Sequence, residues 1–164
     1  MPEPSLQDET PVRRPRFVAR LMHLAFLASR PLTMGARVAA FDDLGRILLV
    51  KHSYVPGWHF PGGGVEAGET AGQAAARELR EEANVETGGA MALHGVFFNA
   101  RASRRDHVVV FVARGARQST PKVADREILA AEFFPVEALP EGVNRAVTER
   151  LTEIAGLAKT SPFW

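Results

Sequence analysis

The sequence predicts a single domain with an α+β or mixed α/β sandwich fold. Several apolar, β-branched segments have the composition of strands, and they surround one central helix, with a second helix near the end of the chain. The chain has 164 residues, of which 46% are hydrophobic and 24% are charged, which is enough to build one buried core. We expect the folded domain to span residues 32–164.

Residues 1–31 are expected to form an extension of this domain. Residues 1–15 are polar and contain four prolines, which predicts a loosely held tail. The apolar segment Phe17–Ser29 follows three arginines and predicts a basic amphipathic helix. We consider three roles for this helix: packing on the domain, a dimer contact, or binding to a membrane surface. Arg20 and His23 interrupt the apolar run, which argues against a signal peptide.

The first two strands are predicted over Gly35–Phe41 and Arg46–Lys51. Asp42–Gly45 lies between them and has the composition of a turn, so we expect the two strands to form a hairpin. Loops are expected over His52–Trp58 and over Gly115–Ala124, where the apolar pattern stops.

A second strand pair is predicted over Met91–Phe98 and His107–Ala113. The run Val108–Val112 has no polar alternation, which predicts that this strand is covered on both faces. A last strand is expected over Glu127–Phe134. The closing helix is predicted over Asn144–Ala158, with four apolar residues on its buried side: Val147, Leu151, Ile154 and Leu157.

The central helix carries clear start and stop signals. Thr70 is a suitable N-cap, and Gln73 three residues later completes a capping box. The helix is expected to end near Ala83, because Asn84 accepts the left-handed conformation that follows many helices. One face carries small side chains for close packing on a sheet, with the closest approach expected at the glycine: Gly72, Ala75, Ala76, Leu79 and Ala83.

Three glutamates, Glu78, Glu81 and Glu82, share the adjoining face of this helix. They repel one another, although Arg77 can pair with Glu81 one turn away, and Ala74 leaves room beside them. A divalent cation would remove the repulsion, since carboxylate oxygens are the ligands that Mg²⁺ and Mn²⁺ prefer. A solvated acidic face balanced by neighbouring arginines is the structural alternative.

A run of three glycines precedes this helix. Gly62, Gly63 and Gly64 allow the backbone to approach a ligand closely, so that amides can contact phosphate oxygens and a carbonyl can face a metal. Taken by themselves, the three glycines would also be explained by a tight turn. Their position just before a capped helix with clustered glutamates favours a phosphate and metal site.

The combined pattern resembles the Nudix box. Gly63, five residues, Glu69, seven residues and then Arg77-Glu78-Leu79-Arg80-Glu81-Glu82-Ala83-Asn84-Val85 follow that signature, with Asn84 in place of the usual glycine. The resemblance implies the Nudix fold, in which mixed β-sheets pack between helices. Asn84 can adopt the same left-handed geometry as glycine, so we expect the loop to be preserved.

The resemblance also implies an activity, namely hydrolysis of a pyrophosphate bond in a nucleoside diphosphate derivative by water attack on phosphorus. The substrate would be a nucleotide sugar such as ADP-ribose or a nucleoside triphosphate, and the cofactor Mg²⁺ or Mn²⁺. By position, Glu78, Glu81, Glu82 and the Gly62 carbonyl would bind the metal. Arg77 would orient Glu78, and Glu69 would support the loop or the attacking water. Glu78 is the first candidate for the proton acceptor, and Glu127 is a second, although a solvated charge also explains Glu127.

Substrate-binding residues are expected outside the box as well as at Gly63 and Gly64. Arg101, Arg104 and Arg105 lie between two predicted strands, where they either bind phosphates or are simply solvated. Trp58 and Tyr54 are candidates for stacking on a base, and packing in the core is the alternative for both.

Composition and charge exclude several other classes of function and partner. The net charge of +1 gives no reason to expect nucleic acid as a partner, and no stretch is long and apolar enough for stable membrane association. The chain has no cysteine, which excludes the catalytic cysteine of Nudix-fold isomerases and fits a cytoplasmic location. A non-catalytic nucleotide-binding or regulatory domain is the alternative function. A homodimer is one possible oligomeric state.

Overall fold

The computed structural model describes residue 26 and residues 31–164. The chain divides between Pro31 and Leu32 into two units, and the fold is that of Leu32–Trp164. The tail and the helix predicted within residues 1–31 therefore lie outside the described residues, apart from positions 26 and 31. Among the described residues, no helix is long and apolar enough to cross a bilayer.

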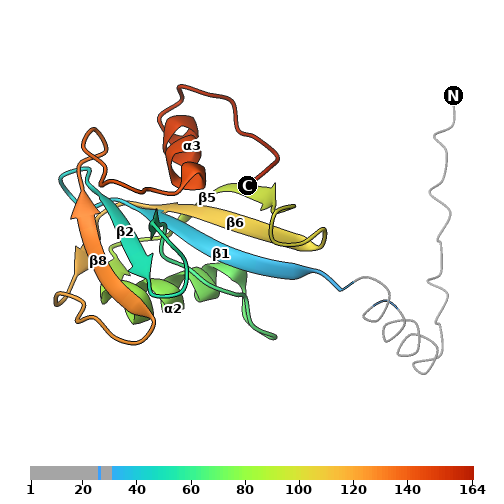
Figure 1. Ribbon diagram of the computed structural model, residues 1–164, viewed down its shortest axis with the longest axis horizontal. Coiled ribbons are helices and arrows are strands. Elements are labelled where there is room, and N and C mark those ends of the chain that lie inside the picture. The colour runs from blue at the N-terminus through green and yellow to red at the C-terminus, as the bar shows by residue number, and fades with distance from the viewer. Residues whose placement is uncertain (1–25, 27–30) are drawn as a thin grey trace, which may run out of the picture. The chain divides into compact units, whose positions relative to one another are not determined.

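Three sheets and two helices make up the folded unit (Figure 1). The first sheet has the order β1 (Thr33–Ala40), β6 (Asp106–Ala113) and β5 (Ala92–Phe98), the second β3 (Trp58–His59), β2 (Ile47–His52) and β8 (Ile128–Phe134), and the third β4 (Val85–Thr87) and β7 (Ala116–Gln118). Helices α2 (Ala71–Ala83) and α3 (Arg145–Ile154) lie on opposite faces of the sheets (Figure 1). This arrangement confirms the predicted mixed sandwich.

Alternating side chains of β1 and β2 fill two separate cores. One set packs with α2, and its strand members are Ala36, Val38, Ala40, Leu48 and Val50. The intervening side chains pack with α3, and they are Ala39, Phe41, Ile47 and Leu49. Because successive strand residues point to opposite faces, these two strands contribute side chains to both cores.

The predicted hairpin of the first two strands is wrong. The turn at Asp42–Gly45 forms, but only the single bridge between Phe41 and Ile47 joins its two arms. β1 pairs in parallel with β6, and β2 pairs with β3 and β8. A tight turn fits both arrangements, so the turn signal alone does not determine which strands pair.

The later strands are predicted correctly, but short elements are missed. β5 and β6 form the expected antiparallel pair, and Val108, Val109 and Val110 at the centre of β6 are buried. β3 begins inside the predicted loop at Trp58, and β7 lies inside the predicted loop Gly115–Ala124. These strands and β4 have two or three residues each, too few to show a periodic pattern.

The closing helix is shorter than predicted. α3 ends at Ile154, and Gly156 follows with a φ of 74°, which is a left-handed conformation that stops a helix. Leu157, predicted to be buried, is 81% exposed because it lies beyond this stop.

Helix α2 begins and ends as the sequence predicts. The Thr70 hydroxyl accepts from the Gln73 amide at 3.2 Å, and the Gln73 side chain accepts from the Thr70 amide at 2.9 Å. Asn84 has a φ of 53° and a ψ of 36° and caps the C-terminus.

The close approach expected at Gly72 is wrong, because a Cβ at this position would meet no atom within 4 Å. Ala74, expected beside the carboxylates, is instead buried in the α2 core.

Replacing Gly72 with alanine is expected to stabilise the protein. The position lies in the first turn of α2 with open space around it, so alanine adds helix propensity without a clash. We expect a gain of about 0.5–1 kcal/mol in the free energy of unfolding. Urea denaturation would measure it. Gly57→Ala is the matched control, because a Cβ there would lie 2.3 Å from the Gly142 carbonyl oxygen, and it should be destabilising.

Replacing Asn84 with glycine is expected to leave stability nearly unchanged. Glycine removes the cost of the left-handed conformation, about 1 kcal/mol, while the Asn84 amide loses its contacts to Thr120 at 3.3 and 3.4 Å. Asn84→Ala keeps the cost and loses the contacts, so it should destabilise by about 1 kcal/mol or more. Thermal unfolding of both variants tests this, and equal stabilities would contradict it.

Candidate active site

The loop that holds the glycines is bonded to the free edge of β1. Three backbone hydrogen bonds join them: the Ala36 amide donates to the Gly63 carbonyl at 2.8 Å, the Val38 amide to the Pro61 carbonyl at 3.0 Å, and the Val65 amide to the Met34 carbonyl at 2.9 Å. Because β1 pairs with β6 along its whole length, this bonding fixes the loop on a rigid support. The loop then leads directly into α2.

Two of the glycines are required by close approach. Gly62 has a φ of 145°, and a Cβ there would lie 2.0 Å from the Ala36 carbonyl oxygen. A Cβ at Gly63 would lie 2.3 Å from Oε1 of Glu78, so any side chain would displace that carboxylate. A Cβ at Gly64 would meet no atom within 4 Å. The role of Gly64 is visible in its carbonyl, which accepts from Arg77 Nη2 at 3.1 Å.

Arg77 joins the loop to the acidic face of α2. Its Nε and Nη2 donate to the two carboxylate oxygens of Glu69 at 3.0 and 3.1 Å. Its Nη1 donates to Glu78 at 2.6 Å and to Glu81 at 3.3 Å. The carboxylates of Glu69 and Glu78 hold the pKa of Arg77 above its usual range. Hydrogen bonds from Arg77 and from the Glu66 amide lower the pKa of Glu69, so this carboxylate stays charged.

Glu82 is the most buried of the three clustered glutamates. It is only 5% exposed, and its Oε2 accepts from the Gly62 amide at 2.8 Å. Burial raises the pKa of Glu82 to about 7, against the effects of the Gly62 hydrogen bond and Arg37. A carboxylate whose charged form is penalised in this way gains most from a bound cation.

Arg37 and His52 also lie at this site, and the sequence interpretation assigned a role to neither. Nη1 of Arg37 donates to the carbonyls of Gly62 and Phe60. His52 Nε2 lies 3.6 Å from Glu82 Oε1. Burial lowers the pKa of His52 to about 4, so the contact joins a neutral ring to Glu82 near neutral pH. Arg37 is the single cation within an apolar predicted strand, and this pattern could have marked it as a functional residue. The sequence around His52 has no comparable feature.

The residues around this cavity suit a divalent cation in their chemistry. Glu78, Glu81 and Glu82 together line one cavity, and all offer carboxylate oxygens. As the side chains stand among residues 31–164, no three acidic or histidine side chains converge on one point. Glu78 and Glu81 are turned toward Arg77, and the side chain of Glu81 is 62% exposed, which leaves it room to rotate. The donor set therefore fits a metal, with side-chain rotation needed at binding.

Glu127 also lines the site. It lines two cavities, of about 450 and 550 Å³, and Glu78 and Glu82 line both as well. The Tyr54 hydroxyl donates to Glu127 Oε1 at 3.4 Å. Burial and the Glu127 charge raise the pKa of Tyr54, so its hydroxyl keeps its proton. The predicted residues Tyr54 and Glu127 are thus brought together with the clustered glutamates.

The other predicted substrate residues lie elsewhere. Trp58 packs against Phe134 with ring centroids 4.9 Å apart, in the core cluster below α3. Arg101 lines a separate cavity of about 860 Å³ beside α3. Arg104 and Arg105 are exposed on the loop between β5 and β6 and line none of these three cavities.

The chain is similar in sequence to known proteins. Residues 31–153 match the family model of the NUDIX domain. The chain is 50% identical over 50 residues to a putative 8-oxo-dGTP diphosphatase of Bacillus subtilis (strain 168), covering 30% of this chain and 34% of the relative. It is 48% identical over 65 residues to diphosphoinositol polyphosphate phosphohydrolase 2 of Rattus norvegicus, covering 39% and 36%. These alignments span about a third of each curated relative.

A solved structure supports the same comparison over a larger part of the chain. A MutT NUDIX hydrolase from Burkholderia pseudomallei superposes with a TM-score of 0.63 at 26% sequence identity. The match covers 74% of this chain and 97% of that protein.

The raised pKa of Glu82 predicts a pH-dependent effect of Glu82→Gln on metal-free protein. With a folded pKa of about 7 against an ordinary 4.5, the folded wild type loses stability as pH rises from 4.5 to 7. His52, with a folded pKa of about 4 against 6.5, contributes the opposite change between pH 4 and 6.5 in both proteins. The variant should therefore gain stability relative to wild type with rising pH, by at most about 3 kcal/mol.

Urea denaturation in chelator at pH 5 and pH 7.5 measures this difference. Glu86→Gln, at an exposed position on β4, is the control and should show no such trend. A difference between Glu82→Gln and wild type that is the same at both pH values would contradict the prediction.

Proposed function

Because the chain belongs to the NUDIX domain family, we propose that it hydrolyses a pyrophosphate bond in a nucleoside diphosphate derivative, with a divalent metal ion as cofactor. The observation that carries this proposal is the arrangement of Arg77, which joins Glu69, Glu78 and Glu81 to the glycine loop. Purely structural helices gain nothing from three carboxylates on one face. A site for a cation and a diphosphate gives each of them a role.

Four groups would hold Mg²⁺ or Mn²⁺ in this proposal, namely Glu78, Glu81, Glu82 and the Gly62 carbonyl. When bound, the ion supplies charge neutralisation for the diphosphate and makes a water molecule more acidic. Arg77 is a positioning residue, because it contacts Glu78 at 2.6 Å and holds that carboxylate beside Gly63. Glu69 accepts two hydrogen bonds from Arg77 and thereby supports the loop.

A carboxylate of this site accepts the proton of the attacking water. Glu78 is our first assignment, since it lines both carboxylate cavities and its position is fixed by Arg77. Glu127 is the second, because it lines the same two cavities. The amides of Gly63 and Gly64 are proposed to contact the phosphates.

The substrate class is a small nucleotide, either a nucleotide sugar such as ADP-ribose or a nucleoside triphosphate. The site cavity of about 550 Å³ is large enough for a diphosphate with one attached group. A non-catalytic nucleotide-binding domain is the alternative function. The complete set of glutamates and the hydrogen bonds that join them to Arg77 favour the enzyme.

Glu82→Gln is expected to abolish hydrolysis of a nucleotide panel assayed with Mg²⁺ and with Mn²⁺. Loss of one metal ligand should lower kcat at least about 100-fold, because the metal is required to stabilise the transition state by several kcal/mol. Release of phosphate or nucleoside monophosphate measures the rate. Glu86→Gln is the matched control, with the same chemical change at an exposed position, and should retain wild-type activity. Tight nucleotide binding by wild type without any turnover would favour the non-catalytic alternative.

A further inference from the structure

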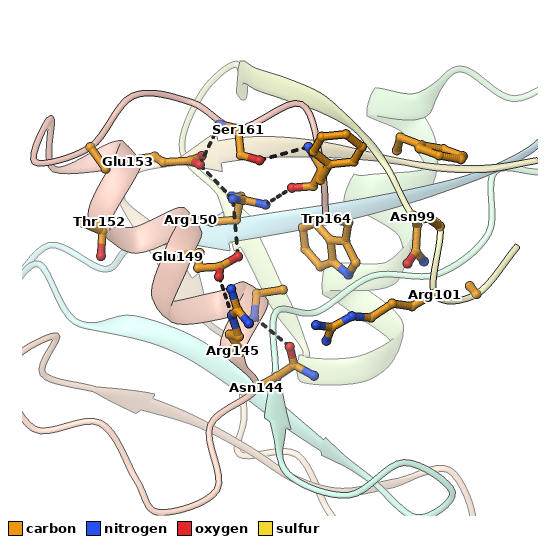
Figure 2. A pocket seen from close by; sticks show the side chains of 16 residues that line it. Asn99, Arg101, Asn144, Arg145, Glu149, Arg150, Thr152, Glu153, Ser161 and Trp164 are labelled. Atoms are coloured by element: carbon orange, nitrogen blue, oxygen red, sulfur yellow. Dashed lines mark hydrogen bonds and ion pairs between the residues drawn. The ribbon is translucent and has the colours of Figure 1, made fainter. Parts of the chain in front are cut away.

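A second cavity adjoins the carboxylate site on the side of α3. It has a volume of about 860 Å³ and lies between α3, the loop that follows β5 and the segment that follows α3 (Figure 2). Asn99, Ala102 and Trp164 line both this cavity and the 550 Å³ cavity that contains Glu78 and Glu82. The two cavities are therefore adjacent, with these three residues lining both.

Trp164 is held firmly in the wall that the two cavities share. Its amide donates to the Phe98 carbonyl at 3.1 Å, and the Phe98 amide donates to the Pro162 carbonyl at 2.9 Å. Its ring packs edge-on against Phe97 with centroids 6.0 Å apart. The indole is thus fixed by the edge of β5, while it remains partly exposed to the cavities.

Arg150 supports the indole from the side of α3. This residue is 1% exposed, and its guanidinium lies 5.8 Å from the centroid of a Trp164 ring. It is fixed by hydrogen bonds to Glu153 at 2.7 Å and to the Phe163 carbonyl at 3.0 Å. Figure 2 shows these bonds next to Trp164. The aromatic surface is therefore preorganised before any ligand binds.

The charges of the second cavity favour an uncharged group over another phosphate. Three arginines and two glutamates line it, so the lining side chains carry a formal charge of only +1. Arg150 is paired with Glu153 and Arg145 with Glu149 at 2.5 Å. Among the described residues, Arg101 alone of the three has no carboxylate partner. A polyanion would meet one unpaired cation, whereas a planar neutral group would keep both ion pairs intact.

Two amide side chains add hydrogen-bonding capacity. Asn99 Nδ2 donates to Asp106 at 2.8 Å, which leaves its carbonyl oxygen as an acceptor. Asn144 Oδ1 accepts from the Ala146 amide at 2.8 Å, which leaves its NH₂ group as a donor. An acceptor and a donor beside an aromatic face match the edge and face of a nucleobase.

We propose that Trp164 is a specificity-determining residue that stacks on the nucleobase of the substrate, with Asn99 and Asn144 available to its edge. The inference rests on the proposed function only in that the diphosphate is taken to lie beside Glu78 and Glu82. It assigns base recognition to the segment after α3, which is separate in sequence from the metal-binding helix.

Tryptophan fluorescence tests the proposal without requiring turnover. The chain has two tryptophans, so Trp58→Phe leaves emission from Trp164 alone and Trp164→Phe leaves emission from Trp58 alone. AMP and GMP should quench Trp164 emission saturably in Trp58→Phe, and ribose 5-phosphate, which has no base, should not. Quenching confined to Trp164→Phe, equal quenching by ribose 5-phosphate, or no quenching by either nucleotide would overturn the proposal.

Steady-state kinetics of Trp164 variants distinguish stacking of the indole on the base from a purely structural packing role. Trp164→Leu keeps an apolar group against Phe97 but removes the stacking surface, so KM for a hydrolysed nucleotide should rise about 10-fold with kcat within about two-fold. Trp164→Phe should restore most of the affinity. Competitive inhibition by pyrophosphate, which has no base, should be the same in all three proteins. Equal loss in both variants, or loss of pyrophosphate inhibition, would show a structural role instead. If wild type hydrolyses no nucleotide, the proposed function fails while the fluorescence result still decides the role of Trp164.

Discussion

The guanidinium of Arg77 is the contact on which the site depends. Five donor groups in one plane reach Glu69, Glu78, Glu81 and the Gly64 carbonyl, so loop and helix fit together in one relative position. Without this cation, the neighbouring carboxylates of Glu78 and Glu81 would repel each other. The charge of Arg77 is permanent, since two of its partners hold its pKa above the usual range. The acidic face is therefore stable in the absence of a metal.

Close packing on the other side of the loop completes this constraint. Gly62 lies against the backbone of β1, and its amide reaches Glu82 while its carbonyl is held by Arg37. The same approach excludes water from Glu82 and so raises its pKa. Arg77 thus binds Glu78 and Glu81, whereas the Gly62 amide binds the buried carboxylate of Glu82. The three glutamates therefore differ in burial because Glu78 and Glu81 contact Arg77, whereas Glu82 contacts the backbone of the glycine loop.

The sequence predicted the parts of this site that depend on local spacing. The capping box, the left-handed Asn84 and the shared face of the glutamates all involve residues within a few positions of one another. The predicted pairing of the first two strands failed because it required knowledge of a distant partner. β1 pairs with β6, about seventy residues later, and not with the strand that follows its own turn. Trp164 reaches its place through backbone bonds to Phe98 on β5, more than sixty residues earlier in the chain, so no local pattern reveals it.

Chemistry and substrate choice consequently have different origins in this chain. The proposed chemical groups come mostly from one continuous stretch between Gly62 and Glu82, and Arg77 ties that stretch together. The second cavity is formed by the loop after β5, by α3 and by the segment that ends at Trp164. None of these makes a hydrogen bond to Arg77 among the described residues. A change in the second cavity can therefore alter which base is accepted while the carboxylates keep their geometry.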